Sequence, residues 1–198
     1  MGSHPIIEGV RRPWKAFVAA LGAMAAVGLV TLASRPARAA TVPKPEQRRR
    51  RIALIGDSYA VGLGPELAKL LVDSDFQYEG HIGENTAQAA VNIPSWLASF
   101  RPDFVLVSLG VNDGCTPNPA NYHAIVRTLR GLNAHIVWIE PPARVYGGGT
   151  SACPDVPKVR DTIRSLGVQT VTTTVLPGVD GLHPNYAPWA VDVIRAIT

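Results

Sequence analysis

Three short apolar runs constrain the fold of this 198-residue chain more than any other feature. They span residues 52–55, 104–107 and 136–139, and every position in them is apolar. Strands that are buried on both faces of a parallel sheet have this near-continuous pattern. Residues 76–82 and 168–175 are weaker strand candidates, which we expect nearer the sheet edges. Together these segments predict a mainly parallel sheet of five strands.

Helix signals alternate with these strands. Pro65 suits the first turn of one helix, and Asn118–Pro119 is typical of a helix cap. Residues 155–166 end before a glycine, and Pro184 is placed to open a last helix. This alternation predicts a single doubly wound α/β domain over residues 51–198, with three α/β/α layers of the flavodoxin-like kind.

The first 39 residues have the pattern of an export signal. Three basic side chains between residues 11 and 15 precede an uncharged apolar run over residues 16–33, and an A-x-A sequence occupies residues 37–39. We expect cleavage after this sequence. The run is near the lower limit for a bilayer span, so an uncleaved membrane anchor is the alternative. Either outcome places the domain outside the cytoplasm, secreted or periplasmic.

Residues 40–50 contain two prolines and four basic side chains, which predicts a flexible basic linker. Residues 1–50 have a net charge of +7, whereas residues 51–198 have a net charge of −3. The excess positive charge therefore belongs to the leader and linker. Because the domain itself is net acidic, a nucleic-acid-binding function loses its main support.

Four polar blocks follow the expected strands: Gly56-Asp57-Ser58, a block at Gly83, Gly110-Val111-Asn112-Asp113, and Asp180-Gly181-Leu182-His183. Ligands of open parallel sheets bind outside the carboxyl ends of the strands, so we expect these blocks to converge. In this order the blocks resemble those of the SGNH, or GDSL-type, serine hydrolases. The resemblance covers the whole domain and implies that family's fold.

The same residues supply the parts that acyl transfer needs. A serine hydroxyl needs a base to take its proton, and His183 is the candidate base for Ser58. Asp180, three residues earlier, can orient that imidazole. The side chain of Asn112 and the backbone N–H groups of Ser58 and Gly83 are candidate oxyanion donors. Each residue alone also suits a cap or a turn, and their joint occurrence favours catalysis.

The resemblance implies an ester hydrolase that uses no cofactor, and the sequence has no pattern with metal-ligand spacing. The irregular stretch 141–154 has few large apolar residues to line a lipid channel. We therefore expect short acyl esters, most plausibly acetyl esters of a carbohydrate. Alternatives are an acyltransferase to a glycan hydroxyl, a lysophospholipase or thioesterase, and a non-catalytic binding module of the same fold.

Cys115 and Cys153 are the only cysteines. Export permits a disulfide, and the even count predicts one between them, with two free thiols as the alternative. The bond would constrain the loop that presents Asn112. Tyr59 and Arg144 are further candidates to line the site.

Overall fold

The computed structural model describes residues 48–114, 116–142, 156–176, 178 and 180–198. The predicted leader, most of the predicted linker, and both Cys115 and Cys153 lie outside the described residues, as does Arg144. Within the described ranges, no helix combines the length and the apolar character needed to cross a membrane.

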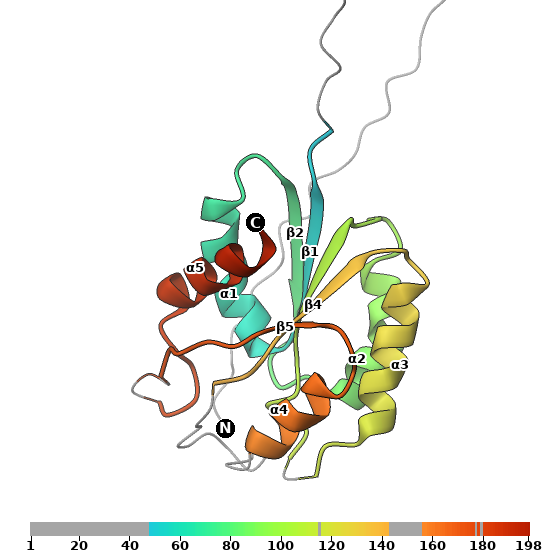
Figure 1. The fold of residues 1–198 in the computed structure, drawn as a ribbon, viewed down its shortest axis with the longest axis vertical. Coiled ribbons are helices and arrows are strands. Elements are labelled where there is room, and N and C mark those ends of the chain that lie inside the picture. Colours follow the sequence, from blue (N-terminus) through green and yellow to red (C-terminus); the bar gives the residue numbers. More distant parts are fainter. Residues whose placement is uncertain (1–47, 115, 143–155, 177, 179) are drawn as a thin grey trace, which may run out of the picture. The chain divides into compact units, whose positions relative to one another are not determined.

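Five parallel strands form one sheet (Figure 1), and the strands are β1 (Arg51–Gly56), β2 (Asp75–Gly80), β3 (Phe104–Ser108), β4 (His135–Ile139) and β5 (Gln169–Val171). Their order is β2-β1-β3-β4-β5, and every neighbouring pair is parallel. The three apolar runs form β1, β3 and β4 inside the sheet, and the two weaker candidates form its edges, as predicted. The strand order changes direction between β1 and β3, which is where flavodoxin-like folds place their ligands.

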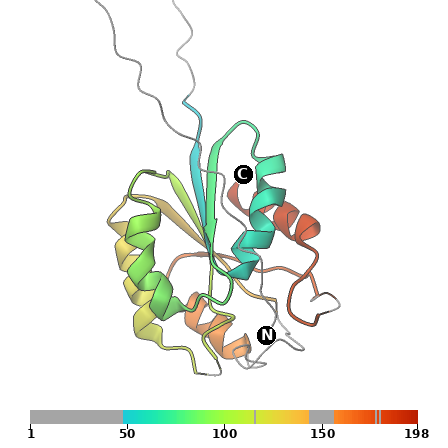
Figure 2. The same cartoon turned by 180° about the vertical axis from the view of Figure 1, so that it is seen from behind.

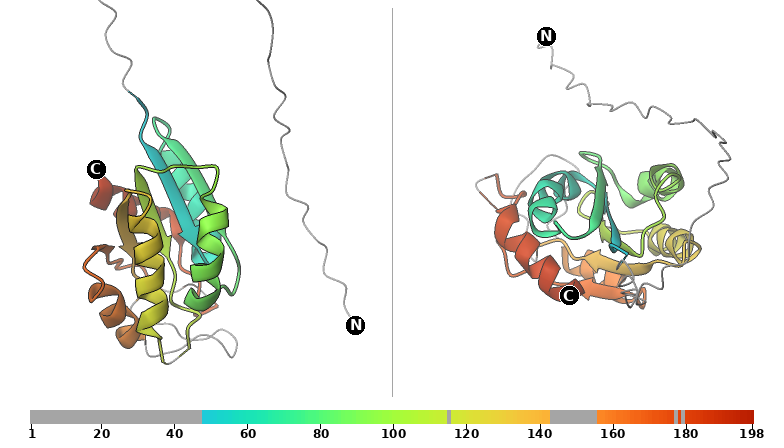
Figure 3. Two further views of the ribbon diagram at one scale, coloured as in Figure 1. Left: turned by 90° about the vertical axis from the view of Figure 1, so that its right-hand side faces the viewer. Right: turned by 90° about the horizontal axis from the view of Figure 1, so that it is seen from above.

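Helices cover both faces of this sheet (Figures 2 and 3), and they are α1 (Ser58–Leu70), α2 (Thr86–Trp96), α3 (Pro119–Arg130), α4 (Val156–Arg164) and α5 (Tyr186–Ile197). Side chains of a strand alternate between the two faces. Leu54 and Leu106 pack with α1 and α5, whereas Ile55 and Val107 pack with α2, α3 and α4. The predicted three-layer α/β/α domain is therefore confirmed.

Two helices differ from the sequence expectations. Pro65 lies inside α1 and not in its first turn, because the helix already begins at Ser58. An interior proline removes a helical hydrogen bond, but burial of Leu63 and Leu67 on the inner face of the helix offsets that loss. Helix α2 was not predicted. Its available signal is the capping box between Asn85 and Gln88, which precedes a segment with few large apolar residues.

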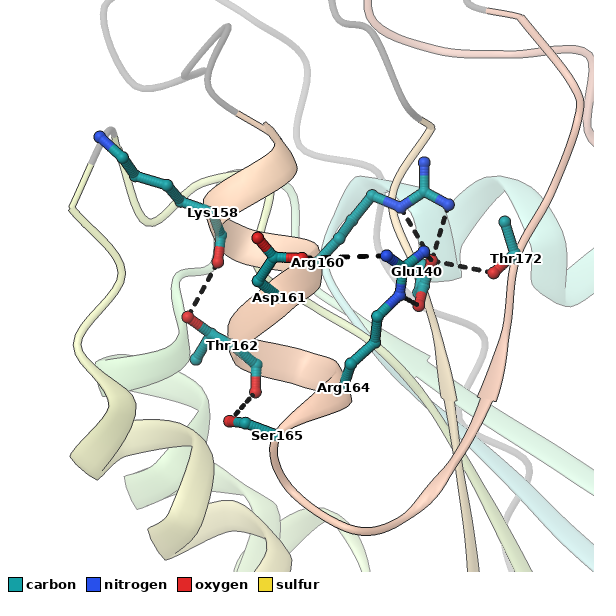
Figure 4. A network of polar contacts seen from close by, with 8 residues as sticks. All are labelled: Glu140, Lys158, Arg160, Asp161, Thr162, Arg164, Ser165 and Thr172. Atoms are coloured by element: carbon teal, nitrogen blue, oxygen red, sulfur yellow. Dashed lines mark hydrogen bonds and ion pairs between the residues drawn. The ribbon is translucent and has the colours of Figure 1, made fainter.

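A buried carboxylate ties α4 and the segment after β5 to the end of β4 (Figure 4). Glu140 is fully buried, and its oxygens accept hydrogen bonds from Arg160 at 2.8 Å, Arg164 at 2.7 and 2.9 Å, and Thr172 at 2.9 Å. Burial alone would raise the pKa of Glu140, but these hydrogen bonds outweigh burial and hold the pKa below its ordinary value. The paired charge is compatible with the core because its partners satisfy it.

Candidate active site

Residues Gly56–Ser58 join β1 to α1 at the carboxyl edge of the sheet, and we call this segment the nucleophile turn. Gly56 lets β1 approach β3 closely, since a Cβ there would lie 2.1 Å from the carbonyl oxygen of Ser108. Asp57 caps the helix by accepting a 2.9 Å hydrogen bond from the backbone N–H of Tyr59. Ser58 is consequently the first residue of α1 and is partly exposed to solvent.

His183 and Asp180 lie in a turn before α5, and this turn folds onto Ser58. One oxygen of Asp180 accepts from the backbone N–H groups of Leu182 at 3.0 Å and His183 at 2.8 Å. The other oxygen lies 2.6 Å from Nδ1 of His183. Nε2 of the same ring lies 3.0 Å from Oγ of Ser58. Three side chains that are up to 125 residues apart in sequence thus form one hydrogen-bonded chain.

The charge on Asp180 fixes the direction of these hydrogen bonds. The hydrogen bond from His183, together with two backbone N–H groups, lowers the pKa of Asp180 to about 2. An ionised carboxylate only accepts, so Nδ1 of His183 carries the hydrogen in this pair. Nε2 of a neutral imidazole is then an acceptor for the Ser58 hydroxyl. This is the arrangement that a general base for a serine nucleophile requires.

Three hydrogen-bond donors lie around the nucleophile turn. Gly83 has a φ of +80°, which favours glycine, in the turn closed by the hydrogen bond from Glu84 N to His81 O at 3.0 Å. Within the described part of the chain, the backbone N–H groups of Ser58 and Gly83 donate to no acceptor. The side-chain nitrogen of Asn112 donates to the Glu84 carbonyl at 3.1 Å and, at 3.3 Å, to Asp57.

Solved structures show what this fold is similar to. No protein-family model matches the chain, and no curated protein matches it significantly. The lipase/acylhydrolase from Enterococcus faecalis matches with a TM-score of 0.63 and 16% identity, over 75% of this chain and 95% of that chain. An acetyl xylan esterase matches with a TM-score of 0.60 and 15% identity, over 74% of this chain and 100% of the other. A GDSL-like lipase from Bacteroides thetaiotaomicron matches with a TM-score of 0.59 and 15% identity, over 75% and 87%.

The chain has the SGNH hydrolase fold. The four motif blocks predicted this fold, and the prediction is confirmed. On this SGNH fold, the predicted residues Ser58, His183 and Asp180 are in direct hydrogen-bond contact. Among the described residues, no group of three metal-ligating side chains gathers to hold an ion.

Tyr59 has a role that sequence analysis missed. It was a candidate to line the site, but it is only 1% exposed and packs beneath the site. Its ring meets the His183 ring edge-on, with centroids 5.9 Å apart, and its hydroxyl donates to the carbonyl of Leu182 at 3.1 Å. Burial raises the pKa of Tyr59, so the hydroxyl stays protonated and remains a donor. In this SGNH fold Tyr59 joins α1, which begins at Ser58, to the turn that carries Asp180 and His183.

Replacing Tyr59 by Phe keeps the ring packing and removes only this hydrogen bond. We expect Tyr59→Phe to lower kcat about tenfold with little change in KM, because the base is less well held against Ser58. Steady-state kinetics on 4-nitrophenyl acetate would measure both constants. Tyr78→Phe, at an exposed tyrosine on the edge strand, is the matched control. Equal kcat values for Tyr59→Phe and wild type would contradict a positioning role.

Asp57 is the middle residue of the nucleophile turn, and it is fully buried. Burial raises the pKa of its carboxyl group to about 8, and the nearby charges of Asp113 and Glu84 act in the same direction. The hydrogen bond from the backbone N–H of Tyr59 acts in the opposite direction but is outweighed. The folded protein therefore keeps a proton on Asp57 over a pH range in which the unfolded chain has lost it.

This proton makes stability depend on pH. Between about pH 4, where the unfolded carboxyl titrates, and about pH 8, the folded state binds one more proton than the unfolded state. The contribution of Asp57 to the free energy of unfolding is therefore complete below pH 4 and is lost as the pH rises toward 8. We expect Asp57→Asn to remove this part of the slope, measured by urea unfolding at pH 5 and pH 8. An unchanged slope would refute the prediction, and Asp75→Asn, at an exposed carboxylate, is the control.

Proposed function

We propose that this protein is a carboxylic ester hydrolase that works through a covalent intermediate on Ser58. His183 Nε2 takes the proton of the Ser58 hydroxyl as Oγ attacks the ester carbonyl carbon. Asp180 stabilises the imidazolium that forms. The bond from the carbonyl carbon to the alcohol oxygen then breaks, and His183 gives its proton to the departing alcohol. Water repeats the sequence on the acyl-enzyme and releases the carboxylic acid.

The negative oxygen of the tetrahedral intermediate needs donors that are already in place. Among the described residues, nothing accepts a hydrogen bond from the backbone N–H groups of Ser58 and Gly83, and Asn112 supplies a side-chain N–H. The weaker of the two Asn112 contacts is the one to Asp57 at 3.3 Å. An oxyanion would take this hydrogen in place of Asp57, while the contact with the Glu84 carbonyl keeps the amide aligned.

One observation carries the proposal: Nε2 of His183 lies 3.0 Å from Oγ of Ser58 while Nδ1 of the same ring is held by Asp180 at 2.6 Å. A serine that merely capped a helix would have no need of an oriented base. The SGNH fold supports the same conclusion, because structural neighbours of this chain are an acetyl xylan esterase and a lipase/acylhydrolase.

For the substrate, we propose short-chain acyl esters, chiefly acetyl esters, of a carbohydrate. Support comes from the acetyl xylan esterase and a family 3 carbohydrate esterase from Clostridium thermocellum among the structural neighbours. Segment 141–154 has few large apolar residues, and for that reason the sequence predicts short acyl groups. This segment lies mostly outside the described residues.

We also propose that the enzyme acts outside the cytoplasm. The support is the basic, apolar and A-x-A succession within residues 1–39. Expression of the full chain with a C-terminal tag, followed by fractionation and N-terminal sequencing, tests this proposal. A mature protein that begins at Ala40 outside the cytoplasm agrees with a cleaved export signal. An intact chain in the cytoplasmic fraction would contradict it.

A series of 4-nitrophenyl esters from acetyl to dodecanoyl tests the chemistry and the acyl preference together. We expect the highest kcat/KM between acetyl and butyryl, and release of acetate from an acetylated xylan. Stoichiometric labelling of Ser58 by a fluorophosphonate would report the activated nucleophile independently of the substrate. A maximum of kcat/KM at octanoyl or longer would overturn the short-acyl proposal. Absence of both labelling and hydrolysis would overturn the proposal that the protein is an ester hydrolase.

Product analysis separates hydrolysis from transfer. The acyltransferase alternative uses the same three residues and differs only in whether water or a sugar hydroxyl takes the acyl group. Incubation with an acyl donor and an excess of acceptor glycan should yield free acid if the protein is a hydrolase. Predominant acylation of the glycan would instead assign the protein as a transferase.

A further inference from the structure

A polar pocket of about 180 Å³ adjoins the candidate oxyanion site. It lies between the turn after β2 and the loop that joins β3 to α3, and its polar lining consists of Asn85, Asn112, Asp113, Thr116, Asn118 and Asn121. Four of these six residues are asparagines. The chemistry of Ser58, His183 and Asp180 gives this pocket no role, although Asn112 belongs both to the pocket and to the candidate oxyanion site.

Two amide groups of this pocket, those of Asn85 and Asn118, are oriented by the protein and keep unused hydrogen-bonding capacity. Asn85 and Asn118 each use the side-chain oxygen to cap a helix, by accepting from the backbone N–H groups of Gln88 and Ala120 at 3.0 and 3.1 Å. Their side-chain nitrogens remain donors without an acceptor in the described part of the chain. Asn121 has no side-chain hydrogen bond there at all. Rotamers fixed in this way reduce the entropy cost of binding a ligand.

The charge of the lining narrows the ligand class. Asp113 is the one ionisable side chain among these residues, and both of its oxygens accept from Thr86, at 2.8 and 2.6 Å. None of the described lining residues is a cation that could pair with a phosphate or carboxylate, and their remaining polar groups are amides and a hydroxyl. Amides both donate and accept, as neighbouring hydroxyl groups on a sugar ring require. The lining therefore suits a neutral, polyhydroxylated ligand.

We infer that this pocket is the subsite for one sugar unit of the ester substrate. The inference rests on the proposed ester-hydrolase function. Asn112 provides the link, because it lines the pocket and also donates to Asp57, which precedes Ser58 in the chain. A sugar held by Asn118 and Asn121 would place an ester on one of its hydroxyls next to the nucleophile. The pocket then determines the preference for sugar esters over simple alcohol esters.

Asn121→Ala tests the subsite, since the Asn121 side chain makes no hydrogen bond to any residue that the structure describes. Loss of one neutral hydrogen bond should lower the selectivity ratio by about three- to tenfold. This ratio is kcat/KM on a mono-O-acetylated methyl β-xyloside, which keeps two free hydroxyl groups, divided by kcat/KM on 4-nitrophenyl acetate. Asn118→Asp keeps an oxygen to cap α3 and removes the donor nitrogen, and it should lower the ratio similarly. Asn133→Gly, in the turn that follows the far end of α3, where φ is 58°, should leave the ratio unchanged.

A binding measurement separates this inference from the proposed activity. Saturation-transfer NMR on the full-length Ser58→Ala protein should detect methyl β-xyloside, and the signal should fall when Asn121→Ala is added. An unchanged selectivity ratio in both pocket variants, or sugar binding that does not depend on Asn121, would overturn the subsite. If the wild type hydrolyses no ester but binds the sugar through Asn121, the subsite stands and the proposed function fails.

Discussion

Ser58→Ala is expected to abolish esterase activity while the protein remains folded. Removing the nucleophile of a Ser-His-Asp system costs ~10⁶ in kcat, so the rate should fall to the level given by binding and oxyanion stabilisation alone. The serine is partly exposed, and within the described ranges its hydroxyl hydrogen-bonds to His183 alone, so its loss removes little packing. Activity on 4-nitrophenyl acetate and the urea unfolding midpoint would be measured on the same preparation.

Ser165→Ala is the matched control for this substitution. Its hydroxyl donates to the carbonyl of Thr162 at the end of α4, far along the chain from the nucleophile turn. We expect wild-type activity from the control. Retention of more than about a tenth of the activity by Ser58→Ala would contradict the nucleophile assignment, because the expected loss is ~10⁶.

Asp180→Asn is expected to lower kcat by about 10³–10⁴ with a much smaller change in KM. An asparagine oxygen still accepts from the backbone N–H groups of Leu182 and His183. Its NH₂ group then faces Nδ1 of His183, which favours the tautomer with the hydrogen on Nε2. That tautomer cannot accept the proton of Ser58, so the loss appears in the chemical step.

The pH range for this experiment follows from the pKa of Asp180, which is about 2. The wild-type carboxylate is therefore ionised at pH 6 to 9, and the kinetic difference between the two proteins should persist across that range. Asp161→Asn, at an exposed carboxylate on α4, provides the control. Wild-type kcat for Asp180→Asn throughout the range would show that Asp180 does not orient the base.

Much of the fold could be predicted because the inner strands are buried on both faces. Residues 52–55 and 104–107 are apolar throughout for that reason. The edge strands give weaker signals: β2 is largely exposed, and β5 has only three residues. Helix α2 escaped prediction because its buried face is made by small or few side chains, Thr86, Ala89 and Ile93, and because a proline interrupts it.

The candidate site was predictable where a chemical role can be filled by only a few residue types. Serine, histidine, aspartate and asparagine in four ordered blocks gave the residues that the structure brings together. The supporting contacts were not predictable, because they join segments that are distant in sequence. Tyr59 reaches Leu182 across 123 residues, and Glu140 meets its arginines only after α4 has folded back over the sheet. Hydrophobic patterns do not specify such pairs.

The two ends of the domain lie at the same edge of the parallel sheet. β1 begins at Arg51 on the amino edge of the sheet, and α5 returns to that edge, where the side chain of Gln169 donates to the carbonyl of Ala196. Ser58 and His183 lie at the opposite edge. A fusion partner, affinity tag or solid support joined at either end of the domain would therefore leave the reactive edge facing outward, toward a polymeric substrate too large to diffuse to it.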